Sequence, residues 1–280
     1  MITNPNVKIN LGLNVLRKRE DGFHDLETLF VPYMGISDTL EIVVGDDYSR
    51  TSAAIFGKYA PDMIAQGISE DGKLMITIAR KEGVDWDPLK DLTAKAYSIL
   101  AEDFDMPAVK IFLEKTSPVG AGLGGGSSDA AFALKMLNEL CGLNLSDGQL
   151  ASYAARLGSD CAFFIYNRPM IGEGRGEILN SYALPSMEDY DLQVLTPEGV
   201  AVSTKDAYGG IRPHLPEVPL RDALKLPVEK WDGVLVNDFE ETVFAKYPEL
   251  AAIKRSLYDS GAVYASMSGS GSALFALYRR

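Results

Sequence analysis

The residues best suited to chemistry are glycines and serines that lie close together near the middle of the chain. Residues 118–131 read P-V-G-A-G-L-G-G-G-S-S-D-A-A, and five glycines fall between Gly120 and Gly126. Glycine has no Cβ and accepts positive φ, so such a segment can fold its backbone N–H groups around an anion. We expect Ser127 and Ser128 to cap a following helix, whose start adds free N–H donors and the positive end of its dipole. The segment therefore predicts a phosphate-binding loop.

Two better-known nucleotide signatures do not account for this segment. Gly120, Gly122 and Gly125 match the G-x-G-x-x-G pattern, which needs a second strand ending in an acid about 20 residues further on. Residues 140–144 read L-C-G-L-N and end a helical stretch instead. A Walker A loop needs a lysine, whereas Gly126 is followed by two serines. Two interpretations of the segment remain. One is a nucleotide-binding loop that works through backbone N–H groups, and the other is a simple tight turn. We favour the first, because a tight turn rarely needs five glycines.

Two charged residues and one amide are candidates for the reacting centre. Lys8 interrupts the strand-like stretch N-V-K-I-N-L, where a lysine usually faces solvent; alternatively, its cation pairs with an aspartate and a transferred phosphoryl group. Asn10 lies two residues further on the same strand face. Asp160 follows a Gly-Ser pair, which suits either an Asx turn or a base acting on a hydroxyl group. For Asp129 we favour stabilisation of a helix dipole over a metal or ligand role.

Two other segments carry side chains or loops suited to binding. Phe23 and His24 follow an Asp-Gly pair and form either a loop aromatic packed over the core or a ring platform for a planar heterocycle. Residues 268–272 read S-G-S-G-S, which could be a hairpin turn. The segment is longer than a hairpin needs and its side chains are small, which favours close approach to a ligand or to another loop.

Strand-like and helix-like patterns alternate along the chain and predict a mixed α/β architecture. Strands are predicted at residues 7–16, 26–31, 38–44, 108–115, 161–166, 192–195, 263–267 and 273–278. Helices are predicted at 91–104, 129–140 (ended by Gly142), 146–157 (capped by Ser146) and 241–258, with an interruption near Pro248. Residues 45–72 are polar and irregular, and a glycine-rich stretch at 168–176 predicts a domain junction.

Composition narrows the range of functions. The net charge is −12 and the pI is about 4.7, which argues against a nucleic-acid-binding surface. Two cysteines form no disulfide framework, and neither a signal peptide nor an 18-residue apolar run occurs, so we expect a cytoplasmic protein with no membrane partner. The chain has only two histidines, which excludes a histidine-rich metal site.

Three segments, in this order, resemble the GHMP kinase superfamily, which includes galactokinase and the homoserine, mevalonate and phosphomevalonate kinases. They are V-K-I-N-L at 7–11, P-V-G-A-G-L-G-G-G-S-S-D-A-A at 118–131 and M-S-G-S-G-S at 267–272. Finer motifs resemble the members that act on a cytidine diphosphate-linked methylerythritol: D-G-F-H-D-L-E-T-L-F at 21–30, G-S-D-C-A-F-F at 158–164 and E-G-R-G-E-I-L at 173–179. The resemblance spans almost the whole chain.

The resemblance implies an α+β fold with two domains. Residues 1–167 would form a nucleotide-binding domain like ribosomal protein S5 domain 2, and residues 168–280 a ferredoxin-like GHMP kinase C-terminal domain. The implied reaction transfers the γ-phosphate of ATP to the tertiary 2-hydroxyl of the methylerythritol, in the non-mevalonate pathway to isoprenoid precursors. Mg²⁺ would be held mainly through the phosphates, with Ser128 as a possible ligand and no dedicated protein metal site. We expect a monomer or homodimer that binds this small molecule and no nucleic acid.

The resemblance also implies the roles of individual residues. Asp160 takes the place of the catalytic aspartate, which accepts or orients the hydroxyl proton, and Lys8 keeps it ionised and offsets charge on the phosphoryl group. The residues implied in acceptor binding are Asn10, Phe23, His24, Tyr208 (as a second face for the cytosine ring), Ser268, Gly269 and Ser270. The residues implied in ATP binding are Pro118, Val119, Gly120, Ala121, Gly122, Leu123, Gly124, Gly125, Gly126, Ser127 and Ser128.

Two alternatives stay open at this point. One is another small-molecule kinase of the same superfamily, with a homoserine-like or mevalonate-like acceptor; recognition of cytosine by Phe23 and His24 would distinguish it. The other is a non-catalytic nucleotide-binding protein on the same fold, against which the joint presence of Lys8 and Asp160 argues.

Overall fold

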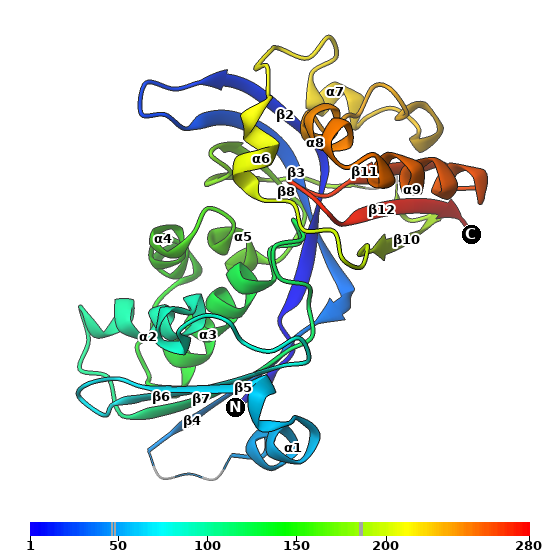
Figure 1. Cartoon of the computed structure of the whole chain (residues 1–280). Helices are drawn as coiled ribbons and strands as arrows, with labels where there is room; N and C mark the ends of the chain where they lie inside the picture. Colours follow the sequence, from blue (N-terminus) through cyan, green and yellow to red (C-terminus); the bar gives the residue numbers. More distant parts are fainter. Residues whose placement is uncertain (46, 48, 185–186) are drawn as a thin grey trace. The chain divides into compact units, whose positions relative to one another are not determined.

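The computed structural model describes residues 1–45, 47, 49–184 and 187–280, which form two compact units (Figure 1). Unit 1 consists of Met1–Val7, Met34–Val119 and Gly124–Asn167, and unit 2 of Lys8–Tyr33, Gly120–Leu123 and Arg168–Arg280. The predicted domains, residues 1–167 and 168–280, are each continuous in sequence, and that assignment stays a prediction. By packing, residues 8–33 and 120–123 group with the C-terminal part, so the glycine-rich segment contributes to both units.

Unit 1 is built on a five-stranded sheet in which the strand order is β1-β4-β7-β6-β5. Strands β6 and β7 run parallel, and the other neighbours are antiparallel. The strands are β1 (Ile2–Thr3), β4 (Thr39–Val44), β5 (Ile64–Ile68), β6 (Leu74–Arg80) and β7 (Val109–Lys115). Their alternating and β-branched apolar residues, such as Ile42, Ile78 and Ile111, are fully buried, as expected for a sheet covered by helices.

The helices of unit 1 lie on both faces of this sheet. Figure 1 shows α2 and α3 on one face and α1 on the other. The bounds are α1 (Thr51–Lys58), α2 (Leu92–Ala101), α3 (Gly125–Leu140), α4 (Asp147–Leu157) and α5 (Cys161–Tyr166), with short 3₁₀ turns η1 (Pro61–Met63) and η2 (Pro88–Lys90). Helix α1 lies in the stretch 45–72 that was expected to be irregular, and its buried Ile55 packs against Val43 and Phe112.

Two predictions about unit 1 are wrong. Helix α3 begins at Gly125 and its N-cap is Gly124 at φ +71°, so Ser127 and Ser128 lie inside the first turn and do not cap it. Residues 161–166 were predicted to form a strand, but they form helix α5. The first five residues of α5 are all buried, and a short continuous apolar run does not distinguish a buried strand from a buried helix.

Other helix boundaries in unit 1 are confirmed. Ser146 accepts a hydrogen bond from the Gln149 N–H, and the Gln149 side chain accepts from the Ser146 N–H, which forms a complete capping box at the start of α4. Gly142 follows the end of α3 at φ +63°, the left-handed conformation that favours glycine after a helix. These local signals act between near neighbours in sequence, which explains why they could be predicted.

Unit 2 contains two antiparallel sheets. The first has the order β2-β3-β8-β9 and the second the order β10-β12-β11. The strands are β2 (Asn6–Lys18), β3 (His24–Ser37), β8 (Met170–Gly174), β9 (Ile178–Ser181), β10 (Tyr190–Leu195), β11 (Tyr264–Met267) and β12 (Leu274–Arg279). The predicted strands on either side of residues 268–272 are thereby confirmed as a paired β11 and β12.

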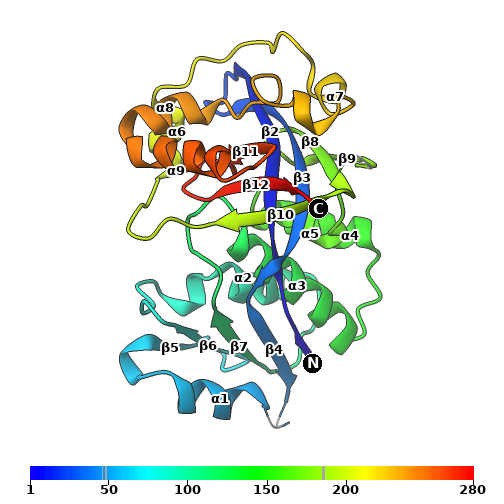
Figure 2. The same ribbon diagram turned by 90° about the vertical axis from the view of Figure 1, so that its right-hand side faces the viewer.

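Helices cover the second sheet of unit 2, and Figure 2 shows α8 and α9 beside β11. The helices are α6 (Thr204–Gly209), α7 (Leu220–Ala223), α8 (Phe239–Lys246), α9 (Pro248–Asp259) and the 3₁₀ turn η4 (Val228–Lys230). A shared core joins Phe239, Leu250 and Met267 to Leu13 and Val15 of β2. Pro248 begins α9, so the predicted interruption of this helical region is confirmed. No helix of the described residues is long and apolar enough to span a membrane.

Candidate active site

Lys8 is buried in β2 and does not face solvent, so the solvent-facing alternative considered for it is wrong. Its relative exposure is 3 %. Its ammonium group donates hydrogen bonds to Asn10 Oδ1 at 2.5 Å and to the carbonyl oxygen of Gly122 at 2.9 Å, and lies 5.5 Å from the centroid of the Phe30 ring. The backbone N–H of Lys8 donates to the carbonyl of Leu123. Within unit 2, the buried ammonium group of Lys8 is therefore in direct contact with residues 120–123 of the glycine-rich segment.

Asn10 is held in one orientation by buried hydrogen bonds. Its Nδ2 donates to Thr28 Oγ1 at 3.1 Å, and the Thr28 hydroxyl donates onward to the carbonyl of Gly12. The backbone N–H of Asn10 donates to Ser268 Oγ at 3.2 Å. Since the amide nitrogen of Asn10 is committed to Thr28, its Oδ1 is the atom that accepts from Lys8. Asn10 thus contacts Lys8 directly. Its contact with an acceptor substrate stays a prediction.

The two glycine-rich segments of unit 2 pack backbone against backbone. A Cβ on Gly122, where φ is +77°, would lie 2.1 Å from the carbonyl oxygen of Ser268. A Cβ on Gly269 would lie 3.0 Å from the Gly122 carbonyl oxygen and 3.1 Å from Asn10 Oδ1. Residues 268–272 do join an antiparallel pair of strands, but their small size serves close approach to another loop, one of the two explanations considered for them.

Ser268 is fully buried, and its hydroxyl group already has two protein partners. It accepts from the Asn10 N–H and donates to the Gly122 carbonyl at 3.0 Å. The structure therefore gives Ser268 a role in joining β2 to the glycine-rich segment. Acceptor binding by Ser268, Gly269 and Ser270 stays a prediction, and the half-buried Ser270 is the member of this set with the most accessible side chain.

The unit 1 part of the glycine-rich segment forms the first turn of α3. A Cβ on Gly125 would lie 2.4 Å from Ser117 Oγ, whereas a Cβ on Gly126 would meet only open space. The first N–H groups of a helix have no partner inside it, so this open side offers donors to an anion. Ser127 is half-buried, while Ser128 is fully buried and its hydroxyl has no hydrogen-bond partner among the described residues. Ser127 is thus the serine that a phosphate or its metal can reach, which disfavours Ser128 as a ligand.

Asp129 is buried in a charge cluster and does not lie at an exposed helix end, so its expected role is wrong. Lys115 Nζ donates to Asp129 Oδ2 at 2.7 Å and to Asp38 Oδ2 at 2.5 Å. The second oxygen of Asp38 accepts from the backbone N–H groups of Thr116 and Ser117, both at 2.6 Å. Nothing in the sequence patterns singled out Lys115 or Asp38, because their pairing joins strand ends that are distant in sequence.

One lysine in this cluster faces two carboxyl groups, and their pKa values move in opposite directions. Burial raises the pKa of Asp129 well above its usual value, more than the charge of Lys115 can offset. Burial acts in the same direction on Asp38, but the charge of Lys115 and hydrogen bonds from Lys115 and Ser117 leave its pKa lowered. Burial opposes the charge of Lys115, but the two aspartates raise its pKa, so Lys115 stays protonated at neutral pH.

Asp160 lies at the N-cap position of α5 in unit 1, and it is half-buried. Its side chain makes no capping hydrogen bond to that helix, although Ser159 Oγ lies 3.5 Å from Asp160 Oδ1. The choice between an Asx turn and a base acting on a hydroxyl group therefore stays a prediction for Asp160. Lys8 belongs to unit 2, and the pairing of Lys8 with Asp160 stays a prediction.

The aromatic residues predicted to bind cytosine form two separate contacts within unit 2. The rings of His24 and Tyr208 stack with centroids 4.9 Å apart, and Tyr208 also meets Phe239 edge-on at 4.7 Å. Phe23 is 54 % exposed, and the guanidinium of Arg175 lies 4.9 Å from its ring centroid. Burial, followed by Lys18, lowers the pKa of His24, which favours a neutral imidazole. A heterocycle would have to replace the His24–Tyr208 contact or stack on the Phe23 side; Arg175 was not predicted for either.

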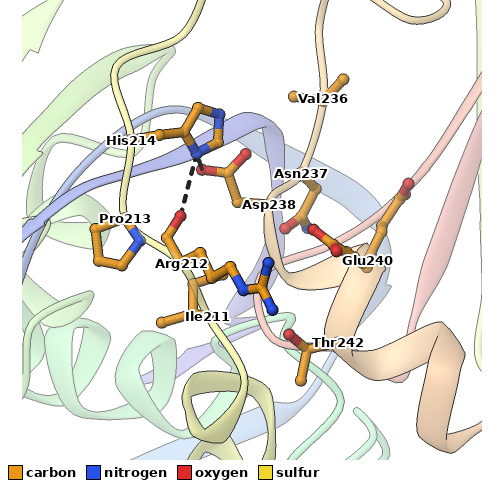
Figure 3. Close-up of a pocket in the computed structure, with 10 residues that line it drawn as sticks. Ile211, Arg212, Pro213, His214, Val236, Asn237, Asp238, Glu240 and Thr242 are labelled. Atoms are coloured by element: carbon orange, nitrogen blue, oxygen red, sulfur yellow. Dashed lines mark hydrogen bonds and ion pairs between the residues drawn. The ribbon is translucent and has the colours of Figure 1, made fainter.

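A pocket of about 560 Å³ lies beside the segment that precedes α8, and Figure 3 shows the side chains around it. Its lining includes Arg212, His214, Asp238 and Glu240. The figure shows the Arg212 guanidinium projecting inward and His214 near Asp238. No residue predicted for the active site lines this pocket, but Asn237, a buried residue that the sequence analysis did not select, is on its wall.

Comparison with known proteins identifies the class. The model of the GHMP kinases N terminal domain matches residues 91–168, and that of the GHMP kinases C terminal domain matches residues 228–280. The chain is 45 % identical, over 99 % of its length and 92 % of the relative, to 4-diphosphocytidyl-2-C-methyl-D-erythritol kinase of Bacteroides fragilis. For the protein of the same name from Bacteroides thetaiotaomicron the identity is 46 % with the same coverage. The chain belongs to the GHMP kinase family and is an ATP-dependent small-molecule kinase.

Solved structures agree with this assignment. A crystal structure of 4-(cytidine 5'-diphospho)-2C-methyl-D-erythritol kinase superposes with a TM-score of 0.75 and 31 % identity, covering 99 % of this chain and 90 % of that one. A homoserine kinase from Cytophaga hutchinsonii superposes with a TM-score of 0.57 at 18 % identity and shares the fold alone. The predicted α+β GHMP kinase fold is confirmed.

Proposed function

We propose that this chain transfers the γ-phosphate of ATP to the 2-hydroxyl group of 4-diphosphocytidyl-2-C-methyl-D-erythritol, a step toward isoprenoid precursors. The observation that carries this proposal is the 45 % identity to kinases of that name over nearly the whole chain. The contact between Lys8 and Gly122 adds a structural reason, since it puts a buried cation against a segment suited to phosphates. A cytoplasmic location and a monomeric or homodimeric state remain predictions.

Binding of ATP would use the open side of the first turn of α3. The free N–H groups of that turn, at Gly125 to Ser127, would donate to phosphate oxygens, and Gly126 leaves room for close approach. Ser127, which is half-buried, would be the serine available to a metal bound to the phosphates. When bound, Mg²⁺ would neutralise charge on the phosphates, and most of its ligands would be phosphate oxygens and water.

The proposed reacting groups divide the work of phosphoryl transfer. Asp160 accepts or orients the proton of the acceptor hydroxyl, and Lys8 stabilises the negative charge on the phosphoryl group. Asn10 orients Lys8 through its Oδ1. Because phosphoryl transfer gains mainly from positioning and charge stabilisation, a fixed lysine is the kind of group that the reaction needs.

Acceptor recognition would use the aromatic residues of unit 2. His24 and Tyr208 already lie together, and Phe23 offers an exposed ring beside Arg175. A cytosine ring would stack on Phe23 or take the place of one partner in the His24–Tyr208 stack, and a neutral imidazole at His24 can donate or accept one hydrogen bond at the edge of the base. Arg175 places a cation beside Phe23, where the diphosphate of the acceptor would meet a complementary charge.

The test is an assay that couples ADP release to a panel of acceptor alcohols. We expect turnover with 4-diphosphocytidyl-2-C-methyl-D-erythritol and none with methylerythritol phosphate, homoserine or mevalonate. Turnover of homoserine or mevalonate instead would identify a different kinase of the family. ATP binding with no turnover of any acceptor would favour a non-catalytic nucleotide-binding protein.

A further inference from the structure

The side chain of Asn237 donates hydrogen bonds to the backbone carbonyl groups of the residues on both sides of Ser268. It is 2 % exposed, and its Nδ2 donates to the carbonyl of Met267 at 2.8 Å and to the carbonyl of Gly269 at 2.9 Å. Its Oδ1 accepts from the backbone N–H of Phe239 at 3.0 Å. Both N–H groups and the oxygen of this buried carboxamide are thus hydrogen-bonded to the backbone. The side chain therefore fixes the backbone position of residues 267–269.

The segment that carries Asn237 is itself fixed to β2. The N–H of Leu13 donates to the carbonyl of Val236 at 2.8 Å, and the N–H of Asp238 donates to the carbonyl of Leu13 at 2.9 Å. The carboxylate of Asp238 accepts from the N–H of Val15 at 2.7 Å. Asn237 therefore reaches the 267–269 segment from residues that are hydrogen-bonded to β2, the strand that carries Lys8 and Asn10.

Ser268 is hydrogen-bonded to both residues that accept hydrogen bonds from Lys8, namely Asn10 and Gly122, so its position affects both. Its hydroxyl accepts from the N–H of Asn10 and donates to the carbonyl of Gly122. The ammonium of Lys8 donates to Asn10 Oδ1 and to the same Gly122 carbonyl. A shift of Ser268 would consequently move both acceptors of the lysine, and all these residues belong to unit 2.

We propose that Asn237 is a positioning residue for Lys8, acting through Ser268. The inference rests on the proposed kinase function for its catalytic consequence, but the geometric part concerns only the lysine and its acceptors. The hydrogen bonds of the Asn237 side chain go to Met267, Gly269 and Phe239. Its effect on Lys8 passes through four hydrogen bonds of 2.8–3.2 Å: Asn237 to Met267 and Gly269, and Ser268 to Asn10 and Gly122. The result is a lysine held in one orientation before ATP or acceptor binds.

Glu240 also holds the backbone near residue 267, so a variant of Asn237 can be tested without loss of strand β11. Glu240 Oε1 accepts from the N–H of Met267 at 2.8 Å and from Ser266 Oγ at 3.0 Å, while Lys254 pairs with its other oxygen at 2.6 Å. Strand β11 therefore stays attached to α8 without the carboxamide. We expect Asn237→Ala to fold and to release the 267–269 segment locally.

The first measurement follows the ammonium of Lys8 by ¹⁵N NMR of lysine side chains, with the signal assigned through Lys8→Arg. Asn237→Ala and Ser268→Ala are expected to change the chemical shift of Lys8 in the same direction. The second measurement is steady-state kinetics, in which both variants should lower kcat about 5- to 10-fold with KM for ATP within about twofold, the size expected for one lost orienting hydrogen bond.

Asn138→Ala is the matched control. Asn138 uses its carboxamide in the same way, with Oδ1 accepting from the N–H of Leu145 and Nδ2 donating to the Leu145 carbonyl, but in unit 1. It should leave the Lys8 signal and kcat unchanged. An unchanged Lys8 signal in a folded Asn237→Ala or, if that variant does not fold, in Ser268→Ala would overturn the proposal, as would a loss of kcat no larger than in Asn138→Ala. Lack of turnover in every protein, with the Lys8 shift present, would instead refute the proposed function.

Discussion

The ammonium group of Lys8 donates a hydrogen bond to the carbonyl oxygen of Gly122 at 2.9 Å. The two residues are separated by 114 positions in the sequence, and both lie in unit 2. The contact links the strand that carries a candidate catalytic cation to the segment proposed to bind phosphates. A lysine with 3 % exposure, held by two oxygen acceptors, has little freedom left to lose when a reaction requires one orientation.

The role of Asp160 as the proton acceptor predicts a specific kinetic change. Asp160→Asn keeps the size and the ability to accept a hydrogen bond but cannot take up the proton. We expect nucleotide affinity to stay within about twofold and kcat to fall by about 10²–10⁴-fold. Calorimetric titration with ADP and the ADP-release assay measure the two quantities.

Asp147→Asn serves as the control for Asp160→Asn, because Asp147 is an exposed acid in the first turn of α4. It should leave kcat unaltered. If Asp160→Asn retains more than about a tenth of the original turnover, the carboxylate is not the base, since proton transfer normally contributes far more.

Two helical glycines with open space around them should differ in their effect on nucleotide binding. A Cβ at Gly126 in α3 or at Gly148 in α4 meets no atom within 4 Å. Alanine at either position should raise the free energy of unfolding by about 0.5–1 kcal/mol, because glycine loses more backbone entropy in a helix. Only Gly126→Ala should weaken ATP binding, because only there would the methyl group occupy the proposed phosphate position.

Urea unfolding and nucleotide titration on both glycine variants check this expectation. Gly122→Ala extends the series, because its Cβ would lie 2.1 Å from the Ser268 carbonyl oxygen and φ there is +77°. That variant should be destabilised, unlike the other two. Equal ATP affinity in Gly126→Ala and Gly148→Ala would mean that the phosphates do not approach the first turn of α3.

The charge cluster of unit 1 predicts a dependence of stability on pH. The pKa of Asp129 is raised in the folded protein, so between about pH 4 and that raised value the folded state holds a proton that the unfolded state has released. Stability should therefore fall as pH rises through this range. Asp129→Asn removes the titrating group and is expected to unfold at higher urea concentration at pH 7, with a smaller difference near pH 4.

Asp38→Asn should have the opposite sign. The pKa of Asp38 is lowered, so its carboxylate stabilises the folded state above about pH 4, and this contribution is lost as pH falls through the lowered value. Replacing it should destabilise the protein at pH 7. The amide keeps one oxygen for the N–H groups of Thr116 and Ser117, but it puts an NH₂ group against the ammonium of Lys115 and the hydroxyl of Ser117, and it removes the negative charge. Urea titrations from pH 4 to 8 test both variants, and a shift of the same sign for both would contradict the assignment.

The stack of His24 and Tyr208 predicts which Michaelis constant changes when one of these aromatic residues is removed. His24→Ala should raise KM for the cytidine-containing acceptor about tenfold, the loss expected for one base-stacking contact, and leave KM for ATP unchanged. Tyr208→Ala should also lower stability, because Tyr208 packs on Phe239 in the core of unit 2. Unchanged acceptor affinity in His24→Ala would make the proposed acceptor wrong.

Phe56→Ala provides a control for aromatic removal, since Phe56 is exposed on α1 and has no proposed role. It should affect neither Michaelis constant. Because the pKa of His24 is lowered, the imidazole is neutral at pH 7, and acceptor affinity should stay constant from pH 7 to 8.5. A decline in affinity over that range would mean that a protonated His24 is required.

Much of the fold could be predicted from local sequence. The capping box at Ser146, the helix end at Gly142 and the break at Pro248 all act between near neighbours, so the residues themselves determine them. Residues 161–166 could not be assigned in this way. A short apolar run satisfies a buried strand and a buried helix equally, and the packing of α5 on α3 and α4 decided between them.

The sequence by itself determined that residues 118–131 could bind a phosphate, because a glycine-rich segment before a helix exposes backbone N–H groups. It also determined the class of protein, through the resemblance of three segments to the GHMP kinases, and with it the candidate residues. Only the tertiary structure decided what several of those residues touch. It showed that Ser268 joins Asn10 to Gly122, that Asp129 pairs with Lys115, and that Asn237 holds the serine segment. These contacts join positions that are 14 to 258 residues apart in the chain. Burial and hydrogen-bond partners of that kind arise only when distant segments pack together, and no local pattern encodes them.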